Sequence, residues 1–84
     1  MEKIKVLKKK VLFRATHRGS KEMDLLLGNF TKKYINELND IELSDLDNLL
    51  NIDDDIIYKW YFEKNSSNLI PNTKVSLMLK NFKL

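Results

Sequence analysis

Residues 20–38, SKEMDLLLGNFTKKYINEL, carry the clearest helical pattern in the sequence. Ser20 suits an N-cap, because its hydroxyl can accept a hydrogen bond from a free backbone amide of the first turn. Glu22 and Asp24 follow where negative charge interacts favourably with the helix dipole. Apolar side chains then recur three or four positions apart and predict a central helix with one buried face: Met23, Leu26, Leu27, Phe30, Tyr34 and Leu38.

Two glycines predict a close approach and a helix end. Gly28 lies inside the central helix, where glycine costs about 1 kcal/mol relative to alanine, so we expect a neighbouring helix to approach closely there. Apolar residues at helical spacing from Ile4 to Val11 predict a first helix that continues to about His17. We expect Gly19 to end this helix with positive φ, which glycine adopts without steric cost.

Three shorter helices are predicted downstream. Ser44 followed by Asp47 resembles a capping box, with Asp in place of the usual Glu, and predicts the start of the third helix. We expect the acidic triplet at residues 53–55 to cap the fourth helix. The fifth is predicted to begin at Asn72 or Thr73.

These patterns predict an all-α fold. No stretch alternates apolar and polar residues for long enough to indicate a strand. With 84 residues, we expect a single helical domain over residues 1–84, arranged as a compact bundle of about five short helices and present as a monomer. A chain of this size can bury a modest core but not a deep catalytic cavity.

The charges are segregated along the chain, although the net charge is only +3. Residues 1–22 hold eight Lys or Arg against two Glu, residues 34–58 hold only acidic charges, and residues 59–84 hold five Lys against one Glu. The folded molecule should therefore have a basic side and an acidic side. Such a surface suits a protein partner at least as well as nucleic acid, which usually favours a more uniformly basic face.

Composition also indicates a cytoplasmic protein. There is no cysteine, so we expect a reducing compartment. No apolar run approaches the roughly 20 residues that cross a bilayer, so we expect no membrane insertion. The Lys-rich N-terminus lacks the apolar segment of a signal peptide.

Candidate catalytic groups are few. His17 is the one histidine, cysteine is absent, and no glycine-rich phosphate loop is present. Consecutive acids at residues 53–55 lack the spacing of a calcium loop, so we expect helix capping and no metal site. The sequence therefore predicts a protein that is not an enzyme and has no stably bound cofactor.

Six charged or special residues crowd the predicted joint between the first two helices: Arg14, His17, Arg18, Gly19, Glu22 and Asp24. One interpretation is a helix joint with a C-terminal glycine and favourable dipole charges. The other is a functional surface, because interchangeable polar residues would serve a simple joint equally well. Trp60 has a similar pair of interpretations, since a lone tryptophan can belong to the core or anchor an interface.

The joint also resembles a known family. HRGSKEMDLLLGNF, residues 17–30, resembles the RGxxE motif of the flavinylation factors of succinate dehydrogenase, with Arg18, Gly19 and Glu22 filling the motif. ELSDLDNLLNIDDDIIYKW, residues 42–60, resembles the second block of that family. The resemblance extends from about Leu12 to Phe82.

The resemblance implies an assembly chaperone for a flavoprotein. Members of this family bind the flavoprotein subunit of succinate dehydrogenase, or of the related fumarate reductase, and promote covalent attachment of FAD to it. The attachment chemistry belongs to the flavoprotein and its FAD. Alternatives are an antitoxin-type regulator, because some family members carry that label, and a small nucleic-acid-binding protein that uses the Lys-rich first helix.

The resemblance also implies a partner-binding surface at the joint, with Trp60 as a further contact. Gly19 would keep the joint flat so that the partner backbone can approach. Arg18 and Glu22 would offer opposite charges on either side of Gly19 for charge-assisted hydrogen bonds.

Overall fold

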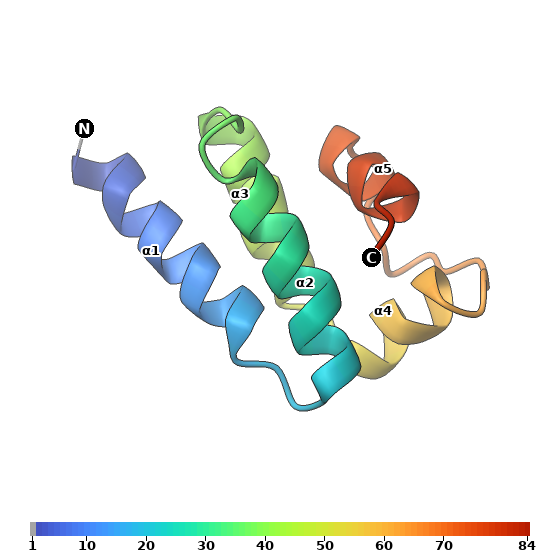
Figure 1. Cartoon of the computed structure of the whole chain (residues 1–84). Helices are drawn as coiled ribbons and strands as arrows, with labels where there is room; N and C mark the ends of the chain where they lie inside the picture. Colours follow the sequence, from blue (N-terminus) through green and yellow to red (C-terminus); the bar gives the residue numbers. More distant parts are fainter. Residues whose placement is uncertain (1) are drawn as a thin grey trace.

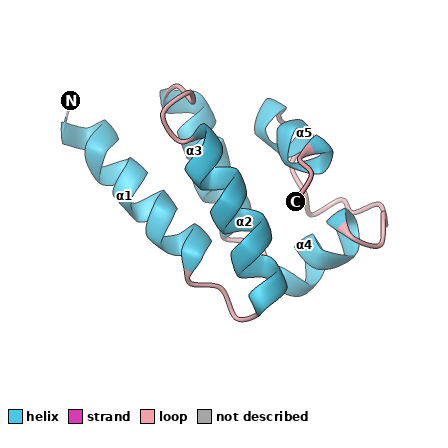
Figure 2. Ribbon diagram, viewed as in Figure 1, coloured by secondary structure: helices cyan, strands magenta, loops and turns pink. Residues whose placement is uncertain are grey.

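The computed structural model describes residues 2–84 and confirms the all-α prediction. Five helices and no strand form in this part of the chain (Figures 1 and 2). Their bounds are α1, Glu2–Thr16; α2, Lys21–Tyr34; α3, Asp40–Leu50; α4, Asp54–Tyr61; and α5, Lys74–Asn81.

The first three helices form an up-and-down arrangement. α1 and α2 run antiparallel and are joined by a short turn at the lower end of the view, and α3 lies behind α2 (Figure 1). α1 contacts both α2 and α3, whereas α5 contacts α3. α4 and α5 lie on the other side of α2 from α1, connected by the longest loop, residues 62–73 (Figure 2).

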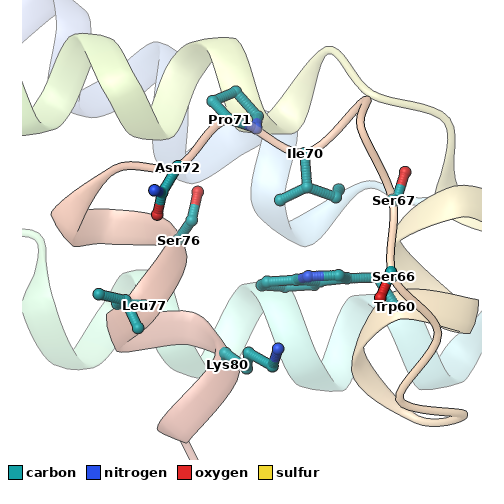
Figure 3. A pocket seen from close by; sticks show the side chains of 9 residues that line it. All are labelled: Trp60, Ser66, Ser67, Ile70, Pro71, Asn72, Ser76, Leu77 and Lys80. Atoms are coloured by element: carbon teal, nitrogen blue, oxygen red, sulfur yellow. The ribbon is translucent and has the colours of Figure 1, made fainter.

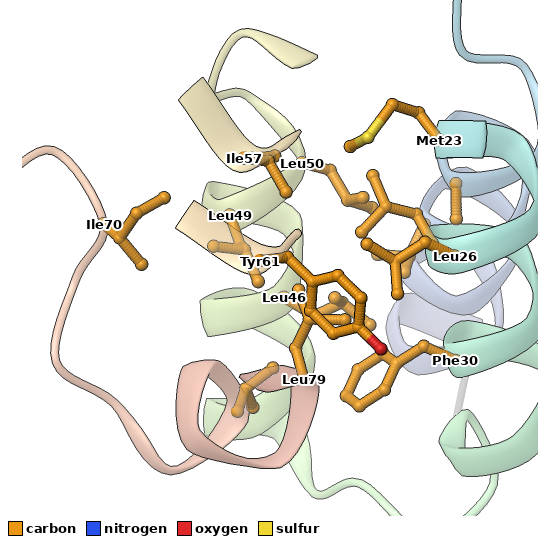
Figure 4. Close-up of a cluster of buried hydrophobic side chains, with 14 of the residues drawn as sticks. Met23, Leu26, Phe30, Leu46, Leu49, Leu50, Ile57, Tyr61, Ile70 and Leu79 are labelled. Carbon is orange, nitrogen blue, oxygen red and sulfur yellow. The ribbon is translucent and has the colours of Figure 1, made fainter. Parts of the chain in front are cut away.

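The core forms where the apolar faces of the five helices meet (Figure 4). The predicted stripe on α2 is confirmed, since Leu26, Leu27 and Phe30 are fully buried. Leu38 lies beyond the end of α2 and is nevertheless buried. The other helices contribute at least one fully buried side chain each, including Val11 and Ala15 from α1, Leu43 and Leu46 from α3, Ile57 from α4, and Val75 and Leu79 from α5.

Gly28 lies where the end of α1 approaches the backbone of α2 closely, as predicted. A Cβ atom there would lie 3.4 Å from Thr16 Cγ2 and 3.7 Å from the Ala15 carbonyl oxygen. These are ordinary contact distances, so the end of α1 packs directly against the backbone of α2 at Gly28, and a single methyl group would also fit there.

Two of the predicted caps are confirmed. The Ser20 side chain accepts a hydrogen bond from the Met23 amide at 3.3 Å, and Thr73 accepts one from the Ser76 amide at 3.1 Å. Both residues have extended backbone, as an N-cap requires.

The predicted start of α3 was wrong. The N-cap lies five residues earlier, at Asn39, and the helix begins at Asp40 after a reciprocal capping box: the Asn39 side chain accepts from the Glu42 amide at 2.8 Å, and Glu42 accepts from the Asn39 amide at 2.9 Å. Ser44 lies within the helix, and Asp47 forms an ion pair with Arg14. The earlier start brings Leu43 into the core, where it is fully buried.

Two other expectations were also wrong. Gly19 does not have positive φ. α1 ends instead with side chains near its last carbonyl groups: the Thr16 hydroxyl donates to the Leu12 oxygen at 2.8 Å, and His17 Nδ1 lies 2.8 Å from the Phe13 oxygen. In the acidic triplet, Asp53 occupies the N-cap position of α4 but makes no side-chain capping bond.

Candidate functional site

The candidate site is the turn at residues 17–20, which links α1 to α2 at the lower end of the bundle in Figure 1. We call it the α1–α2 turn. His17, Gly19 and Ser20 are exposed, whereas Arg18 is partly buried. The turn therefore presents three residues to solvent, whereas the Arg18 side chain is directed into the protein.

Arg18 connects the turn to the junction between α3 and α4. Its guanidinium donates to Asp54 Oδ1 from Nε at 2.7 Å, and Nη2 lies 2.5 Å from the same oxygen. Nη1 donates to the Leu50 carbonyl at 2.8 Å, and Nη2 donates to the Ile52 carbonyl at 3.2 Å. The side chain is only 11% exposed. Arg18 thus satisfies carbonyl groups at the C-terminal end of α3, which have no partner within the helix.

Two carboxylates hold the backbone of the α1–α2 turn. The Arg18 amide donates to Asp24 Oδ1 at 2.5 Å, and the Gly19 amide donates to Asp54 Oδ2 at 3.2 Å. Asp54 therefore binds the Arg18 guanidinium with one oxygen and the Gly19 amide with the other. These bonds join the turn to the first turns of α2 and α4, so its backbone has a defined shape.

The fold itself does not require glycine at position 19. Its φ is not positive, and a Cβ there would lie 3.7 Å from Asp54 Oδ2, an ordinary contact distance. Alanine should therefore fit at this position without strain. A glycine at this position instead suits the binding of another protein, because a side chain there would obstruct the partner's surface.

His17 extends this surface along α1. Its ring stacks on Phe13, with centroids 4.0 Å apart and ring planes at 19°, and Phe13 is 62% exposed. A carbonyl oxygen can only accept a hydrogen bond, so the contact with the Phe13 oxygen places the proton on His17 Nδ1. Nε2 is then the ring nitrogen left to bind other groups.

Glu22 and a shallow hollow border the turn on the other side. Glu22 is exposed in the first turn of α2 and has no ion-pair partner in the described part of the chain. The hollow, about 320 Å³ in volume, lies between the turn and α4 and is lined by Ser20, Met23, Asp54, Asp55 and Tyr58.

Three predicted site residues have mainly internal contacts. Asp24 is partly buried and accepts from the Arg18 amide. Arg14 donates to Asp47 at 2.7 Å and to Asn51, which joins α1 to α3. Trp60 is 7% exposed and lines hollows formed with α5 and the loop at residues 62–73, rather than the hollow beside the turn.

Sequence reasoning missed the contact between Arg18 and Asp54. The two residues are 36 positions apart, so no local spacing connects them. It also missed Tyr58 and Phe13, which border the turn surface from α4 and α1. Their aromatic character on otherwise polar helix faces was the available signal, since exposed aromatic residues are frequent at interfaces.

The fold and the site define a small helical protein whose most distinctive surface is a braced, glycine-bearing turn. The chain belongs to the Sdh5 family, described as flavinator of succinate dehydrogenase, which it matches over residues 9–83. The resemblance inferred from the RGxxE motif is thereby confirmed.

Curated relatives agree with this assignment. The chain is 39% identical over 59 residues to succinate dehydrogenase assembly factor 2 of Scheffersomyces stipitis, covering 70% of this chain and 40% of the relative. It is 32% identical over 73 residues to the FAD assembly factor SdhE of Acetobacter pasteurianus, covering 87% and 64%. It is 34% identical over 77 residues to assembly factor 2 of Saccharomyces cerevisiae, covering 87% and 48%.

The chain thus spans between 40% and 64% of the length of these relatives. Two of the three are named as mitochondrial proteins and one comes from a bacterium. No solved structure matches the chain significantly. Within the described residues, no helix combines the length and the apolar character needed to cross a membrane.

Proposed function

We propose that this protein is an assembly factor that binds the flavoprotein subunit of succinate dehydrogenase, or of fumarate reductase, and promotes covalent attachment of FAD to that subunit. Family membership and the names of the relatives support this function. The structural observation that carries it is the exposed glycine in the α1–α2 turn, which the fold does not require.

The protein acts without catalytic groups of its own. The α1–α2 turn offers a carboxylate, an imidazole and backbone groups on a surface that is exposed to water. The flavoprotein and its FAD supply the attachment chemistry, and no cofactor is stably held by the assembly factor. The protein shifts the partner toward a conformation competent for attachment, and for a tenfold shift it must bind that conformation about 1.4 kcal/mol more tightly than the others.

The structure divides the predicted site residues into two groups. His17, Gly19 and Glu22 are exposed and contact the partner directly. Arg18 and Asp24 are positioning residues, because their side chains hold the turn through internal hydrogen bonds. Arg14 acts similarly by joining α1 to α3. The sequence resemblance implies that both Arg18 and Glu22 offer their charges to the partner. In the present assignment only Glu22 does so, and the Arg18 charge is used inside the protein.

The proposed function is tested by measuring the flavin that becomes covalently attached to the flavoprotein subunit. The flavoprotein subunit is produced with and without the assembly factor, and the attached flavin is measured by fluorescence in a denaturing gel. We expect attachment to depend on the wild-type protein. Gly19→Arg should abolish this effect. Gly19→Ala should leave the fold intact, because a single Cβ fits beside Asp54, and should lower attachment less than Gly19→Arg, because its smaller side chain obstructs the partner less.

Glu22→Ala tests the exposed carboxylate. Glu22 makes no ion pair in the described part of the chain, so helicity measured by circular dichroism should remain at the wild-type level. Flavin attachment should fall at least tenfold, as expected when one charged partner of an interface hydrogen bond is lost. Wild-type attachment with folded Glu22→Ala would show that Glu22 does not contact the flavoprotein.

We also propose that the protein is a monomer in the bacterial cytoplasm. Sedimentation of the purified protein and fractionation of the source cells test these two points separately from the flavin assay. The segregated charges of the chain are consistent with docking to a larger protein of complementary charge.

A further inference from the structure

A second concave surface lies at the other end of α4 from the α1–α2 turn. Two adjoining hollows, of about 270 and 160 Å³, share Trp60, Ser66 and Ser67. We call this surface the Trp60 groove. The larger hollow extends across to α5 and is bordered there by Ser76, Leu77 and Lys80, with Ile70, Pro71 and Asn72 along the loop (Figure 3).

The groove combines the small exposed part of an aromatic ring, since Trp60 is 7% exposed, with an available cation. The Trp60 ring lies between Ile70 and Lys80 in the close-up view (Figure 3). Lys80 Nζ is 5.9 Å from the centroid of the ring. Lys80 has no carboxylate partner in the described part of the chain, so its charge can pair with an external anion. The Ser66 hydroxyl and the Asn72 amide add polar groups around the same hollow.

Apolar side chains extend the surface beyond the hollow. Leu77 lines the hollow and is 55% exposed, and Leu69, next to Ile70 in the loop, is 64% exposed. A small anion bound at Lys80 would leave both leucines in water. An extended polypeptide can cover them while it places a carboxylate on Lys80, which is why a peptide segment fits this surface better than a small metabolite.

The charge of the region indicates the sign of the occupant. Residues 59–84 contain five Lys and one Glu. Lys80 lines the larger hollow, and Lys59 lines the smaller one, where it also forms an exposed ion pair with Asp55 at 3.6 Å. An acidic segment would therefore meet complementary charge along this surface, which promotes association and disfavours basic competitors.

We propose that the Trp60 groove is a second contact surface for the flavoprotein, occupied by an extended segment that carries a carboxylate next to an aliphatic side chain. This inference rests on the proposed function. The carboxylate pairs with Lys80, the aliphatic side chain lies between Trp60 and Leu77, and the segment's backbone hydrogen-bonds to Ser66 and Asn72. The structure thus assigns Trp60 as the aromatic base of a docking groove.

α4 separates the two contact surfaces by a fixed distance. Asp54 and Tyr58 border the α1–α2 turn, whereas Trp60 belongs to the groove. The helix has eight residues and is therefore about 12 Å long. Two weak contacts held at a fixed spacing raise the overall affinity when one partner engages both at once.

Trp60 itself reports on the groove, because it is the only tryptophan in the chain. Overlapping synthetic peptides that cover the flavoprotein sequence, with tryptophan replaced by phenylalanine, are titrated into the full-length protein while its tryptophan emission is recorded. We expect one acidic segment to shift the emission. The shift should require about tenfold more of this peptide for Lys80→Glu than for the wild type. If no peptide changes the emission, the proposal is overturned.

A matched pair of lysine variants tests the groove in the intact complex. Lys80→Glu reverses a charge that lines the groove, and Lys83→Glu makes the same change at an exposed lysine that does not line it. Both variants should remain as helical as the wild type by circular dichroism. We expect the Kd for the flavoprotein to rise about tenfold for Lys80→Glu and less than twofold for Lys83→Glu.

The outcomes separate this inference from the proposed function. Flavin attachment that depends on the wild-type protein, combined with equal Kd values for the two variants, would overturn the groove alone. Flavin attachment that is independent of the wild-type protein would overturn both proposals. A selective loss of affinity in Lys80→Glu, and also in Leu77→Ser, supports the groove.

Discussion

The α1–α2 turn and the loop at residues 62–73 both connect helices, but they are held in different ways. The turn is attached to distant parts of the chain by Arg18, whose guanidinium contacts Asp54 and the carbonyls of Leu50 and Ile52. The loop has hydrogen bonds only to itself and the adjoining helices within the described residues, such as the Asn65 amide to the Lys59 carbonyl at 3.1 Å.

This small protein therefore presents both a fixed surface, at the α1–α2 turn, and an adaptable one, at the loop. Hydrogen bonds to charged groups depend on direction, so they define the shape of the turn. The loop is attached to the core mainly through Ile70, which is buried. Apolar contacts depend little on direction, so the loop can adjust around a bound segment while Ile70 remains in place.

Of the variants considered, removal of the Arg18 side chain should lower the free energy of unfolding most, because it detaches the α1–α2 turn from α3 and α4. Arg18→Ala leaves Asp54 and two carbonyl groups without their partner, and we expect the free energy of unfolding to fall by about 2–4 kcal/mol. Arg18→Lys should recover part of the loss, because one ammonium cannot reproduce all of the guanidinium contacts. Urea denaturation measures both, and a loss below about 0.5 kcal/mol for Arg18→Ala would contradict the bracing role.

Removing the cap at the end of the loop should have an intermediate effect. Thr73 accepts a hydrogen bond from the Ser76 amide at the start of α5. Thr73→Ala should lower the free energy of unfolding by about 1 kcal/mol. Thr73→Ser keeps the hydroxyl and serves as the matched control. Equal losses for the two variants, measured by thermal denaturation, would show that capping is not the reason for the effect.

A stabilising change is available within the loop. Lys64 has φ of 60°, a left-handed conformation that glycine adopts more easily. We expect Lys64→Gly to raise the free energy of unfolding by roughly 0.5 kcal/mol, a value reduced by the greater flexibility of glycine in the unfolded chain. Lys64→Ala, which keeps the strain, should not stabilise the protein. Urea denaturation of the two variants distinguishes strain relief from removal of the lysine charge.

The smallest expected effect concerns pH. The Asn39 amide, and next Lys74 at 3.1 Å, hold the pKa of Glu42 below its ordinary value. A lowered pKa in the folded state stabilises the protein above the unfolded carboxyl pKa of about 4.3, and this contribution is lost as pH falls through the folded pKa. Between about pH 6 and pH 3, Glu42→Gln should therefore lose less stability than the wild type. Parallel pH profiles would exclude this contribution.

Local sequence signals predicted much of the fold. The apolar spacing on α2 and the caps at Ser20 and Thr73 depend on neighbouring residues, so they could be inferred directly. The start of α3 could not be decided in this way, because Asn39 with Glu42 and Ser44 with Asp47 both fit a capping pattern. In the structure the earlier start is used, and Leu43, which lies between the two candidate caps, is helical and fully buried in the core.

The candidate site was only partly predictable. The motif places Arg18, Gly19 and Glu22 together where α1 is joined to α2, but it does not indicate the direction in which Arg18 points. That direction depends on Asp54, which reaches the turn only after the chain has folded. For the same reason the Trp60 groove was not foreseen, because its surface combines α4, α5 and the loop between them.

The carboxylates that bind the α1–α2 turn have a consequence for hydrogen exchange. Amides in surface turns usually exchange with solvent through small local openings. The amides of Arg18 and Gly19 donate to Asp24 and Asp54, so exchange at these positions requires those contacts to open. Both amides should therefore exchange as slowly as amides within a helix, although they lie in a surface connection. Slow exchange of these two amides in the free protein would show that the turn has its defined shape before a partner binds.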